Sequence, residues 1–165
     1  MPSSASAEIT LIDGRSGAGK TVFAAERART EGSYLVSLDD VYPGWDGLDA
    51  GSWHIHQYLL VPRSQGLPGR YRPWSWADAC PGDWVSISAD RPLIVEGCGV
   101  LRRESLELAD RRVWLEQDEP VRRERALGRD GDMYAPHWTR WAVQEERFLA
   151  LHESKDIATE IQTLG

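Results

Sequence analysis

The residues best suited to chemistry form a glycine-rich run of eight, from Gly14 to Thr21, with the spacing Gly-x4-Gly-Lys-Thr. Glycines let a backbone turn sharply and approach an anion closely, and the start of a following helix adds main-chain N–H donors. In such a run Lys20 supplies positive charge to the terminal phosphates, and the Thr21 hydroxyl can coordinate Mg²⁺. We therefore predict that ATP or a related nucleotide is held here, by Gly14, Arg15, Ser16, Gly17, Ala18, Gly19, Lys20, Thr21 and Val22.

Carboxylates at the ends of apolar runs indicate what could happen to the bound phosphates. Asp39 and Asp40 follow the second run, where a carboxylate could accept the proton of a hydroxyl that attacks the γ-phosphate, or help to hold the metal. Asp39 lies nearer the end of the run and is the predicted base; a turn or a helix cap is the structural alternative. Glu96 closes a later run and is predicted to bind a magnesium-bound water. The predicted metal ligands are therefore Thr21, Asp39 and Glu96.

Asp13 directly precedes the glycine-rich run. It could bind substrate, or it could tie down the loop that follows. The sequence leaves both roles open.

Four arginines lie between Arg122 and Arg129, in a segment with helix-forming residues. On a helix, Arg122, Arg125 and Arg129 share one face. Guanidinium groups on a closing lid could neutralise the charge of a transferring phosphoryl group and exclude water. We therefore predict a lid over about residues 119–136. The alternative is a solvated face whose arginines pair with Glu119 and Glu124.

Short apolar runs alternating with helical segments must position these groups. Strands are predicted at 9–12, 34–38, 92–97, 112–116 and 157–158, with an edge strand at 84–87. Helices are predicted at 20–30, 52–61, 102–109, 119–126 and 138–152. This alternation indicates βαβ units and a parallel sheet, hence the α/β class, with ligands at the carboxyl ends of the strands. The aromatic side chains of residues 43–84 could line a substrate pocket or pack an irregular region.

Length and composition restrict the function further. The 165 residues fit a single domain, and the net charge of −7 disfavours binding to nucleic acid. No apolar stretch approaches the ~20 residues that a membrane helix needs. Residues 1–7 lack the features of a signal peptide and are expected to be disordered. The two cysteines suit a reducing compartment, so we expect the cytoplasm. The histidines show no metal-ligand spacing.

The order of these pieces resembles the small P-loop kinases of the nucleoside and nucleotide kinase-like group, most closely uridine kinase-like proteins. The matching segments are 12–21, 38–42, 94–97 and 122–130. The resemblance implies a P-loop NTPase fold with three α/β/α layers, a five-stranded parallel sheet and a short helical lid. It also implies ATP and Mg²⁺ as cofactors, Asp39 as the base on a hydroxyl, and two lid arginines. The predicted catalytic residues are thus Lys20, Asp39, Arg125 and Arg129.

We therefore expect an ATP-dependent kinase that phosphorylates a hydroxyl of a small molecule, with a nucleoside as one candidate. Residues 43–84 match no uridine-binding pattern, so the acceptor stays open. One alternative is a nucleoside-monophosphate kinase, which would need basic residues for the acceptor phosphate; the candidates are Arg63, Arg70 and Arg72. Another is a regulatory module or NTPase without kinase activity. The expected partners are a nucleotide and a small-molecule acceptor, without nucleic acid or membrane, and the protein is expected to be a monomer or homodimer.

Overall fold

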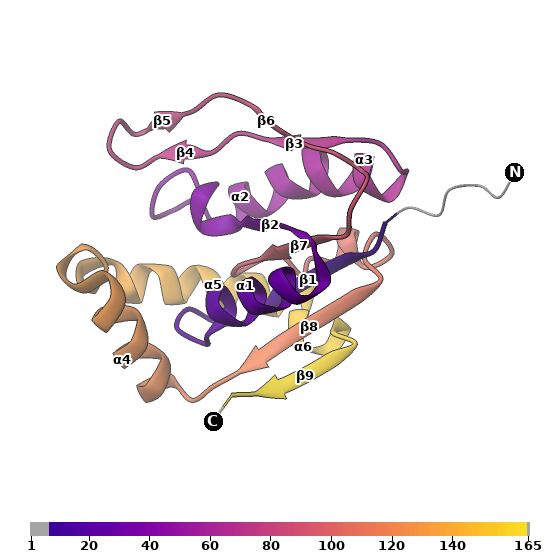
Figure 1. The fold of residues 1–165 in the computed structure, drawn as a ribbon. Helices are drawn as coiled ribbons and strands as arrows, with labels where there is room; N and C mark the ends of the chain where they lie inside the picture. Colours follow the sequence, from indigo (N-terminus) through magenta and orange to yellow (C-terminus); the bar gives the residue numbers. More distant parts are fainter. Residues whose placement is uncertain (1–6, 165) are drawn as a thin grey trace, which may run out of the picture.

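The computed structural model describes residues 7–164, so the expectation of disorder for residues 1–7 falls outside the described chain except at Ala7. Its centre is a five-stranded sheet in the order β2-β7-β1-β8-β9, in which every pairing is parallel (Figure 1). The strands are β1 (Ile9–Asp13), β2 (Tyr34–Ser37), β7 (Leu93–Glu96), β8 (Arg111–Glu116) and β9 (Glu160–Thr163). The predicted α/β class with a five-stranded parallel sheet is confirmed.

Helices cover both faces of this sheet, because successive residues of a strand point to opposite sides. Ile12 packs into a cluster with α1 (Lys20–Glu31) on one face. Ile9 and Leu11 lie in a second cluster, with the helices that follow β2 and with α5 (Trp138–His152). The fold therefore has the predicted three layers (Figure 1).

The register of the strands brings their carboxyl ends to one edge. Glu96 at the end of β7 is aligned with Ser37 at the end of β2 and with Ile12 of β1. Asp13, the last residue of β1, is aligned with Trp114 of β8. Loops that leave these strands therefore open on the same side of the sheet.

Three of the helices predicted from the sequence are present in the structure. The helix α1 ends at Gly32, which has φ 67° and donates its N–H to the Ala28 carbonyl, as a left-handed cap does. The predicted helix at 138–152 is confirmed as α5. The helix predicted at 119–126 continues to Asp130 as α4 (Glu119–Asp130), and two 3-10 turns follow, η4 (Gly131–Met133) and η5 (Ala135–His137).

The helix predicted at 102–109 is wrong. Only a single 3-10 turn forms there, η3 (Arg103–Ser105). Arg102 has extended backbone angles, and its Nη1 donates to Ser52 Oγ at 3.0 Å. The Leu101 N–H donates to Asp13 Oδ2 at 2.9 Å. These bonds to distant residues hold the segment as a buried loop, and tertiary contacts override helix propensity.

The last predicted strand is displaced along the chain. Ile157 belongs to a short helix, α6 (Ser154–Ile157), and packs against the core. Pairing with β8 begins only at Thr159, whose N–H donates to the Arg112 carbonyl at 2.7 Å. The strand β9 therefore follows residues 157–158 and does not include them.

Residues 43–87, hereafter the insert, cross from β2 to β7. They contain α2 (Leu48–Ile55), a π-helical turn η2 (His56–Leu60) and α3 (Val61–Ser64), so the predicted helix at 52–61 is part of a longer helical run. The N–H of Val61 reaches back to the carbonyl of His56, just before Pro62, which has no N–H.

Two antiparallel ribbons complete the insert. They pair β3 (Gly69–Tyr71) with β6 (Val85–Ile87), and β4 (Trp74–Ser75) with β5 (Cys80–Pro81). The strand predicted at 84–87 therefore exists as β6, but it is not an edge of the central sheet. Among the residues that the structure describes, no helix combines the length and apolar character needed to span a bilayer.

Candidate active site

The glycine-rich loop connects β1 to α1, and two of its glycines adopt left-handed backbone angles. Gly17 has φ 83° and Gly19 has φ 98°, in the left-handed region that favours glycine. Within residues 7–164 the N–H groups of Gly17 and Gly19 donate to no protein acceptor. Those of Lys20 and Thr21 open α1, ahead of its first intrahelical bond. The loop thus offers several free donors at a helix start, as an anion site requires.

Lys20 is buried within this loop, at 7% exposure. Its Nζ donates to the carbonyl of Arg15 at 3.0 Å, across the loop. Burial lowers the pKa of this ammonium, but the nearby acidic groups, Cys98 first and then Glu96, Glu145 and Asp13, outweigh that effect, and the pKa is raised. The loop therefore holds a permanent cation beside its free N–H groups.

Glu96 is buried next to the first turn of α1. Its Oε1 accepts hydrogen bonds from Thr21 Oγ1 at 3.3 Å and from Ser37 Oγ at 2.6 Å. Burial raises the pKa of Glu96, and the positive charge of Lys20 opposes that rise. A hydroxyl and a carboxylate in contact are the oxygen ligands that Mg²⁺ and its bound waters prefer.

The two aspartates after β2 form a 3-10 turn, η1 (Leu38–Asp40), in which the Asp39 N–H donates to Ser37 Oγ at 3.3 Å. The Asp39 side chain is half-exposed and lines a cavity in front of the loop. Its Oδ2 lies 4.0 Å from Nη2 of Arg129. Asp40 does not line this cavity, and its pKa is raised by burial and by the charge of Asp39.

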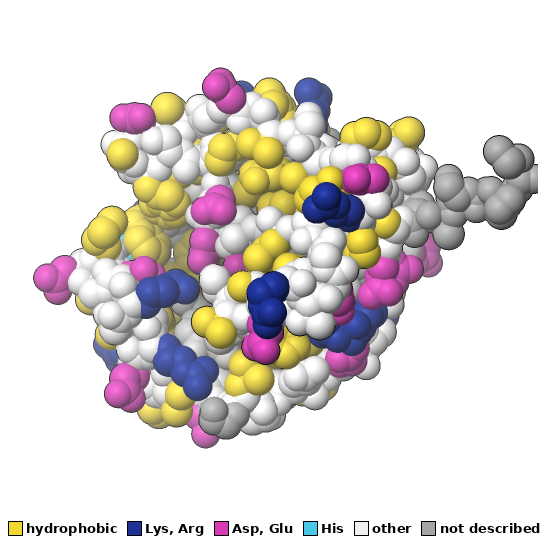
Figure 2. Space-filling model, in the orientation of Figure 1, with side chains coloured by type: hydrophobic (Ala, Val, Ile, Leu, Met, Phe, Trp, Pro, Cys, Tyr) yellow, Lys and Arg dark blue, Asp and Glu magenta, His cyan; other side chains and the backbone are white. Residues whose placement is uncertain are grey.

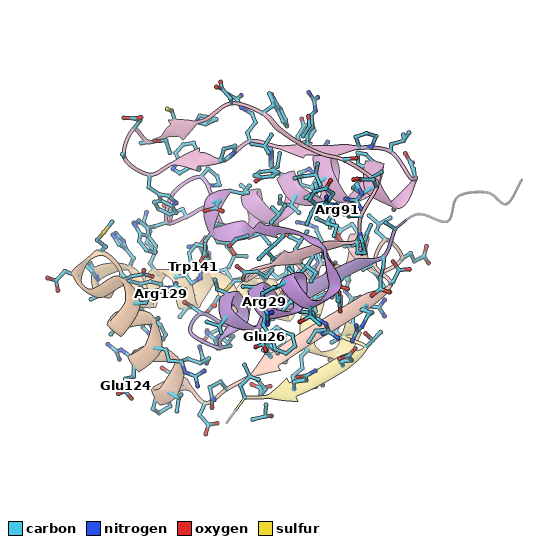
Figure 3. All side chains as sticks on the ribbon, in the orientation of Figure 1. Glu26, Arg29, Arg91, Glu124, Arg129 and Trp141 are labelled. Carbon is cyan, nitrogen blue, oxygen red and sulfur yellow. The ribbon has the colours of Figure 1, made fainter. Side chains whose placement is uncertain are left out.

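The arginines of α4 divide into two kinds. Arg125 and Arg129 line the cavity, and Figure 3 shows Arg129 on the side of α4 toward the sheet. Arg122 is buried and donates from Nη1 to the Ser16 carbonyl at 3.3 Å, so it fixes the loop. Within residues 7–164, neither Glu119 nor Glu124 forms an ion pair with these arginines, which disfavours the solvated-face alternative.

Asp13 holds the start of the loop and the segment after β7 in place. It is almost fully buried and does not line the cavity. Its carboxyl accepts from the N–H groups of Gly14 at 2.6 Å, Gly99 at 3.2 Å and Leu101 at 2.9 Å. Burial raises its pKa to about 6, against the lowering effect of these three bonds. Of the two roles that the sequence leaves open, this geometry supports the structural one.

Two contacts to the loop were not foreseen from the sequence. Glu145 of α5 is 4% exposed, and its Oε2 accepts from the Ser16 N–H at 2.7 Å while its Oε1 accepts from Nε of Arg15 at 3.2 Å. The Cys98 thiol also donates to Glu145, at 3.1 Å. Tyr134 donates its hydroxyl to Ser16 Oγ at 2.8 Å. Both residues lie more than 100 positions from the loop, so no local pattern points to them.

Six of the groups described above line a single cavity of about 720 Å³: Lys20, Thr21, Asp39, Glu96, Arg125 and Arg129. This is within the range of about 300–1,000 Å³ typical of small-molecule sites. Its floor is the phosphate loop with Asp39 and Glu96, and α4 forms one side. Figure 2 shows the hollow between the lid segment and the insert, with hydrophobic side chains around it. Five aromatic side chains also line the cavity: Tyr42, Trp45, Trp76, Tyr134 and Trp141.

The basic residues suggested for an acceptor phosphate lie elsewhere. Arg63 is buried and donates from Nη2 to the Arg91 carbonyl at 2.6 Å. The guanidinium of Arg70 lies 4.2 Å from the centroid of Trp84, and Nε of Arg72 donates to a carbonyl of the insert at 2.9 Å. None of the three lines the cavity, so the structure does not support this cluster as an acceptor site.

The sequence matches no family model and no curated protein. Solved structures are similar over nearly the whole chain. A possible uridine kinase from Bacillus stearothermophilus superposes with a TM-score of 0.65 at 16% identity, over 96% of this chain and 90% of that one. Shikimate kinase from Acinetobacter baumannii, solved with shikimate, superposes with a TM-score of 0.55 at 13% identity, over 98% and 86%. Together with the loop between β1 and α1, these likenesses show that the chain has the fold of the P-loop kinases.

Proposed function

We propose that this protein transfers the γ-phosphoryl group of ATP to a hydroxyl group of a small molecule. The observation that carries the proposal is the shared cavity, which joins the free donors of the phosphate loop to a carboxylate and two arginines. A kinase needs these groups around one space, because phosphoryl transfer is catalysed by positioning and charge stabilisation. The fold neighbours, which include kinases acting on small molecules, support the same reading.

Each group has a role in this reaction. The acceptor oxygen attacks the γ-phosphorus, the bond to the bridging oxygen breaks, and ADP leaves. Asp39 takes the proton of the acceptor hydroxyl, since its carboxylate is accessible from the cavity. Lys20, Arg125 and Arg129 neutralise the charge that spreads over the phosphoryl oxygens.

The residues also fit Mg²⁺. Thr21 Oγ1 would bind the ion directly, and Glu96 would bind it through water, because the two side chains are already in contact. Asp39, on the same side of the cavity, is the third predicted ligand. When bound, Mg²⁺ reduces the negative charge on the phosphates.

Two observations weigh against the alternatives. An acceptor that is itself a phosphate would need cations in addition to Lys20, Arg125 and Arg129, and Arg63, Arg70 and Arg72 do not line the cavity. A simple NTPase or regulatory module needs no room for a second substrate. Here the cavity extends past Asp39 to an aromatic wall. We therefore favour transfer to a hydroxyl over both.

The direct test is ADP release with Mg²⁺ and a panel of alcohols, nucleosides and nucleotides. We expect an acceptor to stimulate release, and Asp39→Asn to reduce transfer by about 10²–10⁴-fold while ATP affinity stays close to wild type. Asp40→Asn is the matched control, because Asp40 does not line the cavity. If Asp40→Asn is the variant that loses transfer, the base has been assigned to the wrong residue; if no acceptor stimulates release, the kinase proposal fails.

A further inference from the structure

Ser16 is the residue of the phosphate loop that contacts the most distant parts of the chain. Its N–H donates to Oε2 of Glu145 in α5 at 2.7 Å, and its carbonyl accepts from Nη1 of Arg122 in α4 at 3.3 Å. Its Oγ accepts from the hydroxyl of Tyr134 at 2.8 Å, between η4 and η5 of the lid segment. Each polar group of Ser16 is therefore bonded to a different element.

The Ser16 hydroxyl has a hydrogen available for a ligand. The side chain lines the cavity beside Gly17 and Lys20. Within residues 7–164 its O–H donates to no protein acceptor. Burial raises the pKa of Tyr134, so this phenol stays protonated and acts as the donor in its bond to Ser16. A phosphate oxygen that accepts from Ser16 would complete a chain of two hydrogen bonds, in which each bond strengthens the other.

The ring of Tyr134 begins a series of contacts that ends at the turn carrying Asp39. Its centroid lies 5.2 Å from that of Trp45, and the two rings meet edge to face. Trp45 in turn lies 5.1 Å from Trp76, at an interplanar angle of 57°. Trp76 Nε1 donates to the main-chain carbonyl of Asp39 at 3.3 Å. Side chains from separate segments thus connect Ser16 with the main chain of Asp39.

The placement of the Asp39 carboxylate depends on this turn. Among the described residues the carboxylate forms no hydrogen bond, and its Oδ2 is 4.0 Å from Nη2 of Arg129. Side chains hold the main chain of Asp39 at two points, because its N–H donates to Ser37 Oγ and its carbonyl accepts from Trp76. Trp76 is 41% exposed, so its contact is the one that a shift of the neighbouring rings can loosen.

We propose that Tyr134 is a positioning residue, which transmits the presence of phosphate at Ser16 to the turn that carries Asp39. The inference rests on the proposed kinase function, because Asp39 is the base of that reaction. When phosphate accepts from Ser16, the Tyr134 hydroxyl is held more firmly, and its ring keeps Trp45 and Trp76 in place. Coupling of this kind is reciprocal, so the same contacts favour nucleotide binding.

Amide hydrogen exchange tests the coupling without an acceptor. The probe is the β,γ-imido analogue of ATP with Mg²⁺. In the wild type we expect it to slow exchange at residues 14–22, where it binds, and at residues 74–78 around Trp76. The second effect should be about threefold to tenfold, the scale of one hydrogen bond. Residues 74–78 contain no group that we propose to contact phosphate.

Tyr134→Phe removes only the hydroxyl and keeps the ring beside Trp45. It should abolish the slowing at residues 74–78, retain that at residues 14–22, and lower the affinity for the analogue by about threefold to tenfold, measured by calorimetry. At saturating ATP, where weaker affinity no longer matters, kcat with the acceptor found above should still fall by a similar factor.

Two further variants complete the test. Ser16→Ala should also abolish the slowing at residues 74–78, and adding Tyr134→Phe to it should cause no further loss, because both changes remove the same bond. Tyr34→Phe is the matched control: its hydroxyl donates to Asp90 at 2.7 Å, away from the cavity, so this variant should behave as the wild type. Circular dichroism checks folding, and Ser16→Ala keeps the test available if Tyr134→Phe does not fold.

The outcomes separate the two proposals. Slowing at residues 14–22 without any at 74–78 in the wild type would overturn this inference and leave the kinase function intact. Slowing at 74–78 that persists in Tyr134→Phe would overturn it as well, because the nucleotide would then act on Trp76 directly. Additive losses in the double variant would do the same. No slowing at either segment would mean that the analogue does not bind, and both proposals would fail together.

Discussion

The two ends of the cavity are built differently. At the phosphate end, the cavity is lined by residues of one short stretch, Ser16–Val22, which includes the free N–H groups of Gly17 and Gly19. At the end where we propose that the acceptor binds, the aromatic side chains that line the cavity come from four separate segments. The carboxylates of Asp13 and Glu145 accept buried hydrogen bonds that hold the phosphate end in place, whereas Trp76 at the other end is half-exposed. The phosphate end is therefore determined by the local backbone geometry of one loop, whereas the other end is determined by packing between distant segments.

The largest expected effect tests the phosphate end alone. Lys20→Ala removes the buried cation of the loop, and we expect kcat/KM to fall about 10³-fold, as when a charge-stabilising donor is lost. Lys155→Ala is the control, because the only other lysine of the chain pairs with Glu116 on the surface. Steady-state ADP release measures both variants. Wild-type activity in Lys20→Ala would remove the basis for the phosphate site.

The burial of Asp13 predicts that the stability of the fold depends on pH. The pKa of Asp13 is raised from 3.8 to about 6 in the folded protein. Its contribution to stability is therefore fully present below pH 3.8 and is lost as pH rises through about 6. At 1.36 kcal/mol per pKa unit, the loss is about 3 kcal/mol.

Urea unfolding of the wild type and of Asp13→Asn between pH 4 and pH 8 measures this loss. The stability difference between them should shift in favour of Asn as pH rises, because Asn carries no charge to bury. Asp132→Asn, at an exposed position, should track the wild type. Parallel curves for wild type and Asp13→Asn would show that Asp13 does not titrate in this window.

The contact between Glu145 and the phosphate loop is tested by comparing variants of Glu145 and of its neighbour Glu146. Glu145→Ala leaves the Ser16 N–H without its acceptor, and we expect nucleotide affinity to fall about 10-fold to 100-fold, the effect of losing a buried hydrogen bond to a charge. Glu146 is 68% exposed, and its Oε1 lies 3.8 Å from Nη2 of Arg15. Such an exposed ion pair contributes little, so Glu146→Ala should change nucleotide affinity less than twofold. Similar behaviour of the two variants would mean that α5 does not position the loop.

The smallest effect concerns the acceptor end. Arg70 stacks on Trp84 outside the cavity, so Arg70→Ala should change the KM for any acceptor by less than about twofold. Competition between a nucleoside and its monophosphate provides the readout. A selective loss of the monophosphate in Arg70→Ala would revive the phosphate-acceptor alternative and weaken the contrast between the two ends.

The sequence predicts most of the sheet because strands such as β1 and β7 are short apolar runs, and because Gly32 ends helix α1 before β2 begins. It fails where distant contacts decide the local conformation. The sequence predicts a helix at 102–109 after β7, but hydrogen bonds donated by Leu101 to Asp13 and by Arg102 to Ser52 hold this segment as a loop. The ribbons of the insert pair only with each other, and no periodicity in the sequence indicates their partners.

The same division applies to the candidate site. The phosphate loop is recognisable because its residues are adjacent in sequence, and the structure sets Lys20, Asp39 and Glu96 around one cavity; their roles stay predictions. Glu145 lies within the helix predicted at 138–152, but its contact with Ser16 spans 129 positions. Tyr134 gives no signal of its own. Such residues become visible only when the chain is folded.

The self-contained pairing of β3 with β6 and of β4 with β5 has a consequence for variation of this scaffold. These ribbons share no hydrogen-bonded edge with the central sheet. Every group proposed to contact phosphate comes from the phosphate loop, the ends of β2 and β7, or α4, all outside the ribbons. Length changes in the ribbons that keep the bond from Trp76 to the Asp39 carbonyl are therefore expected to leave the sheet register unaltered, so the insert is the segment in which acceptor preference could change while the phosphate-binding part stays the same.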